Sequence, residues 1–177
     1  AGFNVLSGHV AGWVGVGGPR QGPNGSDEWL QVGFSGFPEL AGSDLYYELT
    51  LPGKQPTYHQ LASNLPLGKP ARIAVLEMHK RPNMWRVWLN GSAASAPIYM
   101  PGSHGRWAPI ATAESWDGGT AGACNGFLYR FHRVSLARVP GGGWHELSGG
   151  YPISSSSTRL ARRTTSGGSW PTSTRAP

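Results

Sequence analysis

Acidic side chains are the most informative candidates for chemistry in this sequence, because only nine of its 177 residues are Asp or Glu. Two of them, Glu48 and Glu114, stand among aromatic residues in runs that favour strands. A carboxylate is costly to bury unless it is hydrogen-bonded or has a function. Gln31, between Leu30 and Val32, is placed in a similar way. Strand alternation leaves a plainer alternative open, in which each of these polar side chains simply faces water.

Other reactive residue types show no arrangement that predicts a site. No GxSxG motif prepares a serine nucleophile, and Cys124 has no CxxC partner. This lone cysteine is either a nucleophile or a small buried hydrophobe. The histidines are scattered without the paired spacing of a metal site, and we expect neither a metal nor a cofactor: His9, His59, His79, His104, His132 and His145.

The elements that must position these residues are strands. Short runs of strand-type residues bounded by Gly, Pro and Asn recur along the chain, and helical periodicity is scarce. Residues 79–83 are expected to connect a hairpin, and Asn90-Gly91 to form a tight reversal. Several runs are apolar on both faces, which predicts an all-β fold of two packed antiparallel sheets, a β-sandwich of the jelly-roll, concanavalin A-like kind. The predicted strands are 10–16, 29–34, 45–51, 71–78, 84–89, 96–100, 108–114 and 126–139.

Composition and charge divide the chain into two parts. With 38% hydrophobic residues the chain can bury one core, which we assign to a sandwich domain over 1–148 with a net charge of +2. Residues 149–177 are rich in Ser, Thr and Gly and carry four Arg but no acid. Within this segment, 158–165 forms either an edge strand or part of a loose tail. Such a basic segment could contact an anionic surface or cell wall, and nucleic acid is a less favoured partner.

The location of the protein is predicted from the same composition. No window approaches the roughly 18 apolar residues of a membrane span. The low share of charged residues, 14%, together with the Trp, Gly and Ser content, is typical of secreted proteins.

Four short pieces give these residues a family context. They read WVGVGG at 13–18, LQVGF at 30–34, YYE at 46–48 and AESW at 113–116. In this order and spacing they resemble the glutamic peptidases, or eqolisin family, whose pieces read WVGIDG, LQTG, WYEWYP and AEW or AEF. The opening SGHVAGWVGVGG is similar to that of secreted bacterial relatives. Two family aspartates are absent here, because Gly17 and Ser35 stand in their places.

The resemblance implies a catalytic pair made of Gln31 and Glu114. Glu114 would take a proton from water as the water attacks the scissile carbonyl, and would then return it to the leaving amine. The Gln31 amide would donate to the developing oxyanion, a contribution typically worth about 3 kcal/mol. The expected function is therefore a secreted acid endopeptidase acting on polypeptides.

The resemblance also implies a substrate-binding wall formed by aromatic and acidic side chains, namely Trp13, Tyr46, Tyr47, Glu48 and Trp116. Two other functions stay open. The aromatic content would also suit a non-catalytic sandwich that binds carbohydrate or cell wall, and the basic segment would suit an extracellular structural protein.

Overall fold

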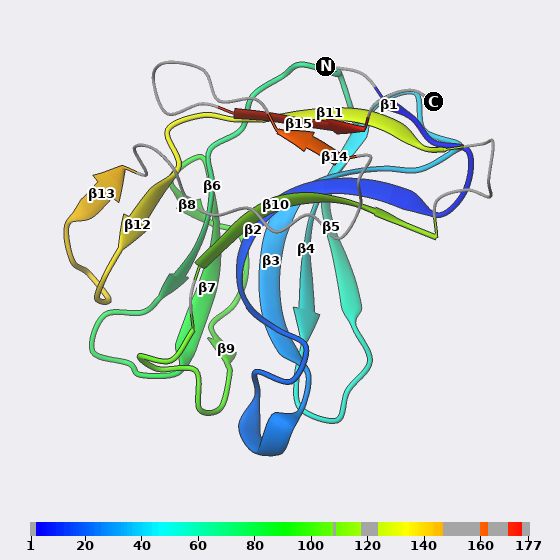
Figure 1. Cartoon of the computed structure of the whole chain (residues 1–177). Helices are drawn as coiled ribbons and strands as arrows, with labels where there is room; N and C mark the ends of the chain where they lie inside the picture. Colours follow the sequence, from blue (N-terminus) through cyan, green and yellow to red (C-terminus); the bar gives the residue numbers. More distant parts are fainter. Residues whose placement is uncertain (1–2, 108, 118–123, 147–159, 163–169, 175–177) are drawn as a thin grey trace.

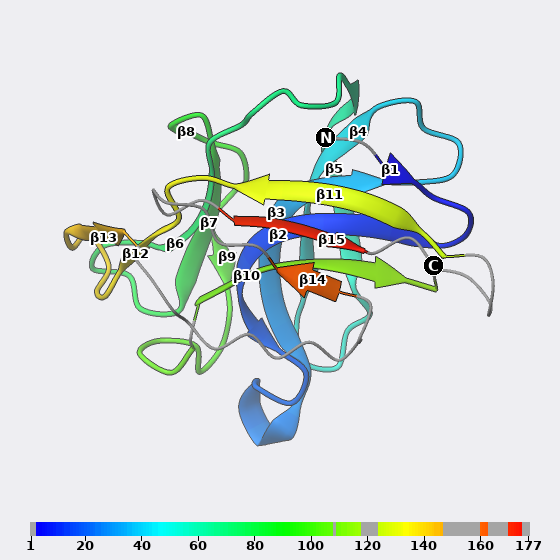
Figure 2. The same cartoon turned by 45° about the horizontal axis from the view of Figure 1, so that its top comes forward.

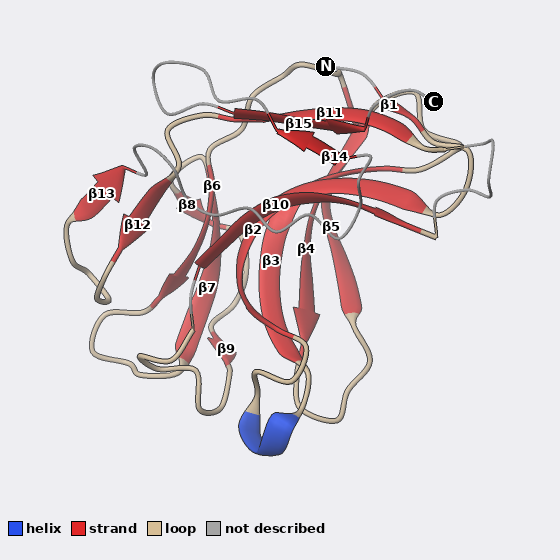
Figure 3. Ribbon diagram, viewed as in Figure 1, coloured by secondary structure: helices blue, strands red, loops and turns tan. Residues whose placement is uncertain are grey.

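Nearly all regular structure in this protein is β-strand. The structure, a computed structural model, describes residues 3–107, 109–117, 124–146, 160–162 and 170–174, with side chains described up to residue 146. Within these residues a single short 3-10 turn, η1 (Pro23–Gly25), interrupts the strands (Figure 3). The predicted all-β class is confirmed.

A five-stranded antiparallel sheet forms the centre of the molecule (Figure 1). Its strand order is β10-β2-β3-β4-β5, so β10, which comes late in the chain, pairs with β2 at one edge. The bounds are β2 (His9–Gly18), β3 (Glu28–Gly36), β4 (Ser43–Thr50), β5 (Thr57–Leu65) and β10 (Pro109–Trp116).

Three smaller sheets complete the described part. One joins β6 to β7, which also pairs with β8 and β9, and another has the order β1-β11-β15-β14. This second sheet lies across the top of Figure 1 and comes forward in Figure 2, while the separate β12–β13 hairpin lies to one side. The bounds are β1 (Phe3–Asn4), β6 (Ile73–Glu77), β7 (Met84–Leu89), β8 (Ser92–Ala93), β9 (Ile98–Tyr99), β11 (Gly126–Phe131), β12 (Ser135–Ala137), β13 (Trp144–Glu146), β14 (Leu160–Arg162) and β15 (Trp170–Thr174).

Two hydrophobic clusters hold two of the smaller sheets against one face of the five-stranded sheet. In the larger cluster, Leu30 and Val32 from β3 pack with Val87 from β7. In the other, Val10 from β2 packs with Phe127 from β11. Burial of a side chain of this size contributes roughly 1.5–3 kcal/mol. The five-stranded sheet is thus one layer of a sandwich whose other layer is divided between smaller sheets.

Most predicted strands are present, and the differences have local causes. The hairpin over 79–83 is confirmed, and Asn90 and Gly91 have the positive φ angles, 51° and 88°, that a tight reversal needs. The predicted strand 126–139 is instead two strands, because the chain turns at Arg133, where φ is 50°. Strands β5, β8, β13 and β15 lie outside the predicted strands, since polar or small residues are frequent in them.

The basic segment is described only in part. Strand β15 pairs with β11 on one side and with β14 on the other, and β14 lies within 158–165. The rest of 149–177, including Arg159, Arg163 and Arg175, lies outside the described residues. No helix in the described part is long and apolar enough to cross a membrane.

Candidate active site

The five-stranded sheet has one apolar face and one polar face. Successive strand side chains point to opposite faces, and residues paired across antiparallel strands share a face. The apolar face carries the core residues Val14, Leu30 and Val32. The opposite face, here called the polar face, carries Trp13, Trp29, Gln31, Ser35, Asp44, Tyr46, Glu48, Tyr58, Gln60, Thr112 and Glu114.

The predicted catalytic residues Gln31 and Glu114 both belong to the polar face. Gln31 pairs with Gly15, and Gly15 pairs with Ile110, which is four residues before Glu114 on β10. The two side chains are therefore two strands apart and four residues apart along the strand direction. An intermediate row of paired residues separates them, and it contains Tyr46 and Trp13.

Tyr46 makes direct contact with Gln31 from this intermediate row. The Gln31 Nε2 donates a hydrogen bond to the Tyr46 hydroxyl oxygen at 3.0 Å. Both side chains are buried, with exposed fractions of 6% for Gln31 and 2% for Tyr46. A buried amide with a fixed partner keeps one orientation, so the position of its NH₂ group is set by the fold.

Glu114 lies in an environment that favours its protonated form. Burial raises its pKa above the ordinary value of 4.5, and the charge of Glu48 adds to the increase. The nearby indole of Trp13 acts in the opposite direction and lowers the pKa. Its buried Nε1 has no hydrogen-bond partner of regular geometry among the described residues. The Trp13 N–H is therefore available as a donor close to the Glu114 carboxylate.

Glu48 is fixed in place beside Gln31. The two residues are direct partners across β3 and β4, and the Trp29 Nε1 donates to the Glu48 Oε1 at 2.8 Å. Trp29 was not predicted as a site residue. The sequence does indicate that Trp29 and Gln31 share a face, because they lie two residues apart in the predicted strand 29–34 and residues i and i+2 of a strand share a face.

A row of rings borders the polar face on the side of β5. Tyr58 stacks on Tyr46 with ring centroids 4.8 Å apart, and Phe37 contacts both Tyr58 and His9. Burial lowers the pKa of His9, an effect that the charge of Glu48 opposes.

Trp116 follows Glu114 by two residues and is 67% exposed. Aromatic surface is therefore available next to Glu114.

The structure does not bring Tyr47 together with the other predicted wall residues. Tyr47 follows Tyr46 directly, so its side chain lies on the apolar face, where it packs against the larger core cluster and stacks on His59. Tyr46 and Glu48, by contrast, are on the polar face with Trp13. Alternation along β4 was sufficient to make this distinction.

Gly33 has a packing role within the polar face. A Cβ atom at Gly33 would lie 2.3 Å from the Gly12 carbonyl oxygen and 2.6 Å from the Trp13 Cβ. No larger residue fits unless the neighbouring strand moves. Because Gly33 has no side chain, the side chains of its strand partners Trp13 and Tyr46 can occupy the space between Gln31 and Ser35.

The glutamic peptidases that the sequence resembles have an aspartate at the position of Ser35, and here a carboxyl group lies beside that position. Ser35 replaces that aspartate, and it pairs directly with Asp44 on β4. Asp44 is buried and accepts hydrogen bonds from the Gln60 Nε2 and the Asn64 backbone N–H, at 2.6 and 3.0 Å. The Ser35 hydroxyl pairs with the Tyr58 hydroxyl at 2.9 Å. A hydrogen-bonded carboxyl group is therefore present on this strand pair.

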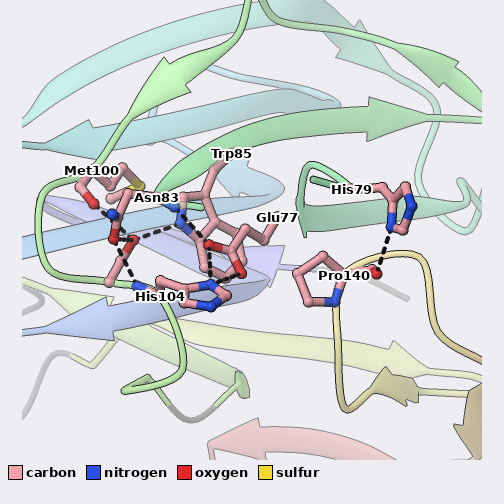
Figure 4. Close-up of polar contacts among 8 residues, drawn as sticks. Glu77, His79, Asn83, Trp85, Met100, His104 and Pro140 are labelled. Carbon is pink, nitrogen blue, oxygen red and sulfur yellow. Dashed lines mark hydrogen bonds and ion pairs between the residues drawn. The ribbon is translucent and has the colours of Figure 1, made fainter. Parts of the chain in front are cut away.

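A second cluster of polar residues lies between the β6–β7 hairpin and the loop after β9 (Figure 4). Glu77 Oε1 accepts from the Asn83 backbone N–H at 2.7 Å and contacts the His104 Nδ1 at 2.9 Å. Although Ser103 is adjacent, its hydroxyl donates to the Met100 carbonyl at 2.7 Å. These contacts hold two turns together and do not prepare a serine nucleophile.

A surface hollow of about 430 Å³ lies at one end of the five-stranded sheet. It is formed by the loop between β2 and β3 and the loop between β4 and β5, and its lining includes Asp27 and Lys54. We place no chemistry there, because the polar face gathers the acids, the amide and the aromatic rings.

The architecture agrees with one solved structure, the crystal structure of aspergilloglutamic peptidase from Aspergillus niger. The TM-score is 0.59 at 13% sequence identity, and the match covers 96% of this chain and 100% of that chain. The fold is that of a glutamic peptidase. No protein-family model matches the chain, and no curated protein is found to be similar. At this identity the glutamic peptidase likeness concerns the fold, so activity has to be argued from this chain's own residues.

Proposed function

We propose that this protein is a secreted endopeptidase that works at acid pH, with Glu114 and Gln31 as its catalytic residues. The observation that carries the proposal is that both side chains share the polar face of one sheet, although they are distant in the sequence. The glutamic peptidase fold supports it independently. Polypeptides are the proposed substrates, bound beside the exposed Trp116.

The proposed reaction uses water as the nucleophile. The Glu114 carboxylate takes a proton from water while the water oxygen attacks the scissile carbonyl carbon. The carbonyl oxygen becomes an oxyanion and accepts a hydrogen bond from the Gln31 NH₂ group. Glu114, now a carboxylic acid, returns the proton to the leaving nitrogen as the C–N bond breaks, which restores the carboxylate.

The pH dependence follows from the state that Glu114 needs. It must be a carboxylate to act as the base, and burial raises its pKa above 4.5. We therefore expect kcat/KM to fall as the pH decreases through a value above 4.5.

The decisive experiment measures cleavage of denatured protein and of quenched fluorescent peptides between pH 2 and pH 8. Glu114→Gln and Gln31→Ala are expected to reduce kcat by about 100-fold or more, since each removes a group that acts in the transition state. Glu39→Gln and Gln55→Ala are the matched controls, because both side chains are exposed in loops. Absence of cleavage by the wild type over the whole range would exclude the peptidase function.

The carbohydrate-binding alternative receives less support. The exposed aromatic residues Tyr58, Tyr99, Trp116 and Trp144 are spread over three sheets, and the two in the same sheet, Tyr58 and Trp116, lie on its opposite edge strands, β5 and β10. Stacking on a sugar chain would require rings that share one surface. We therefore do not carry this function forward as a second proposal.

A further inference from the structure

The hydroxyl of Tyr46 has a position that the proposed reaction has not yet used. Tyr46 belongs to the row of paired residues between the rows of Gln31 and Glu114, on the same face as both. Its ring is held by stacking on Tyr58, at a centroid distance of 4.8 Å and an interplanar angle of 11°. The hydroxyl of a buried and stacked tyrosine has little freedom to move.

The hydrogen bond with Gln31 leaves the Tyr46 proton available. A tyrosine hydroxyl can accept a hydrogen bond and also donate one. Its oxygen accepts from the Gln31 Nε2 at 3.0 Å, so the O–H group is left to donate elsewhere. The Tyr46 row lies on the Glu114 side of the Gln31 row, and the charge of Glu114 raises the pKa of this hydroxyl more than that of Glu48 does. The proton is therefore expected to point towards the Glu114 side of the face.

We propose that Tyr46 is a positioning residue that links the two catalytic groups, with its oxygen orienting the Gln31 amide and its proton directed towards Glu114. This inference rests on the proposed peptidase function. Gln31 gives one amide hydrogen to Tyr46 and keeps the other for the oxyanion. The directed O–H favours the carboxylate form of Glu114 through the water that Glu114 activates.

Tyr46 itself stays protonated throughout the reaction. Burial raises the pKa of its hydroxyl, and the charges of Glu114 and Glu48 raise it further. The hydroxyl therefore contributes a fixed dipole and is not a second acid or base. The hydroxyl contributes by holding the catalytic groups in place, and misplacement of such groups can reduce the catalytic rate by about 100-fold.

The Tyr46→Phe variant tests this role because it removes the hydroxyl and keeps the ring that stacks on Tyr58. We expect kcat to fall about tenfold or more, with KM changed by less than about threefold. The acid limb of kcat/KM should move to higher pH, since the Glu114 carboxylate loses a donor. The control is Tyr47→Phe, which removes a hydroxyl one residue away on the apolar face and should leave the acid limb in place.

Two measurements that do not need activity complete the test. Carbon-13 NMR titration of the glutamate carboxyl groups should show a higher Glu114 pKa in Tyr46→Phe than in the wild type. The Gln31 side-chain NH₂ signals should also shift and lose protection from solvent exchange. A thermal melt of each variant checks that it is folded.

The outcomes separate the two proposals. If the wild type cleaves no peptide but both NMR changes occur, the peptidase function is overturned and the link through Tyr46 is upheld. If the wild type is active but Tyr46→Phe keeps its kcat, acid limb and Glu114 titration, the positioning role is overturned and the catalytic pair stands. Unchanged NMR signals in a folded, inactive protein would overturn both.

Discussion

Replacing Glu28 with Gln is expected to remove much of the pH dependence of this protein's stability. Glu28 is the first residue of β3 and has no exposed surface, and neither of its carboxylate oxygens has a hydrogen-bond partner among the described residues. A Cβ at Gly22 would lie 2.9 Å from its Oε2, so the loop between β2 and β3 packs directly on the carboxylate. Burial raises the pKa of Glu28 from 4.5 to about 7.

The sign and size of the effect follow from this shift. The folded state holds the Glu28 proton more tightly than the unfolded chain, so the stabilisation is complete below pH 4.5 and is lost as the pH rises through 7. One pKa unit corresponds to about 1.4 kcal/mol, which gives about 3 kcal/mol between pH 4 and pH 8. This is an upper value, because a single surface loop covers the side chain and water can reach it when the loop moves.

The assay is urea unfolding followed by tryptophan fluorescence at pH 4, 6 and 8. The free energy of unfolding of the wild type minus that of Glu28→Gln should decrease by up to about 3 kcal/mol from pH 4 to pH 8. Groups that titrate in both proteins cancel in this difference. Glu39→Gln, a change at an exposed acid, should show no such trend. Parallel pH profiles for the wild type and Glu28→Gln would refute the reasoning.

Two further substitutions test the packing of the central sheet by the same unfolding assay. Leu30→Ala removes a side chain with no exposed surface from the larger core cluster and should cost about 2–5 kcal/mol; a loss below 1 kcal/mol would contradict the assigned core. Gly33→Ala places a Cβ 2.3 Å from the Gly12 carbonyl oxygen and should cost at least about 1–3 kcal/mol, whereas Gly126→Ala meets open space and should change stability by less than about 0.5 kcal/mol. Equal losses in the two alanine variants would contradict the close strand approach.

The strands that the sequence predicts well are those whose side chains are apolar or β-branched over several consecutive residues. Strands β2, β3 and β7 are of this kind, and WLQVGF and MWRVWL lie within β3 and β7. Strand β5 was missed because its sequence, TYHQLASNL, mixes polar and small residues. It forms a strand through pairing with β4 at the edge of the sheet, which is a tertiary effect that local propensity does not record.

The candidate site could be predicted only in part for a similar reason. The chemistry of Gln31 and Glu114 followed from a resemblance in short motifs, but their common face depends on β10 pairing with β2. No local pattern specifies which distant strands become neighbours. Tyr58 had no sequence signal, since β5 itself was not predicted, whereas the separation of Tyr47 from Tyr46 follows from strand alternation alone.

The pairing of β10 with β2 also has a consequence for when the protein can act. Glu114 arrives opposite Ala11 only after most of the sandwich domain has been synthesised, so the acid and the amide are assembled by one of the longest-range pairings in the fold. Such non-local pairings form slowly compared with hairpins. A nascent or truncated chain that ends before β10 keeps Gln31 and Tyr46 but lacks the carboxylate. On the proposed function, hydrolytic capacity would therefore begin only when folding is nearly complete.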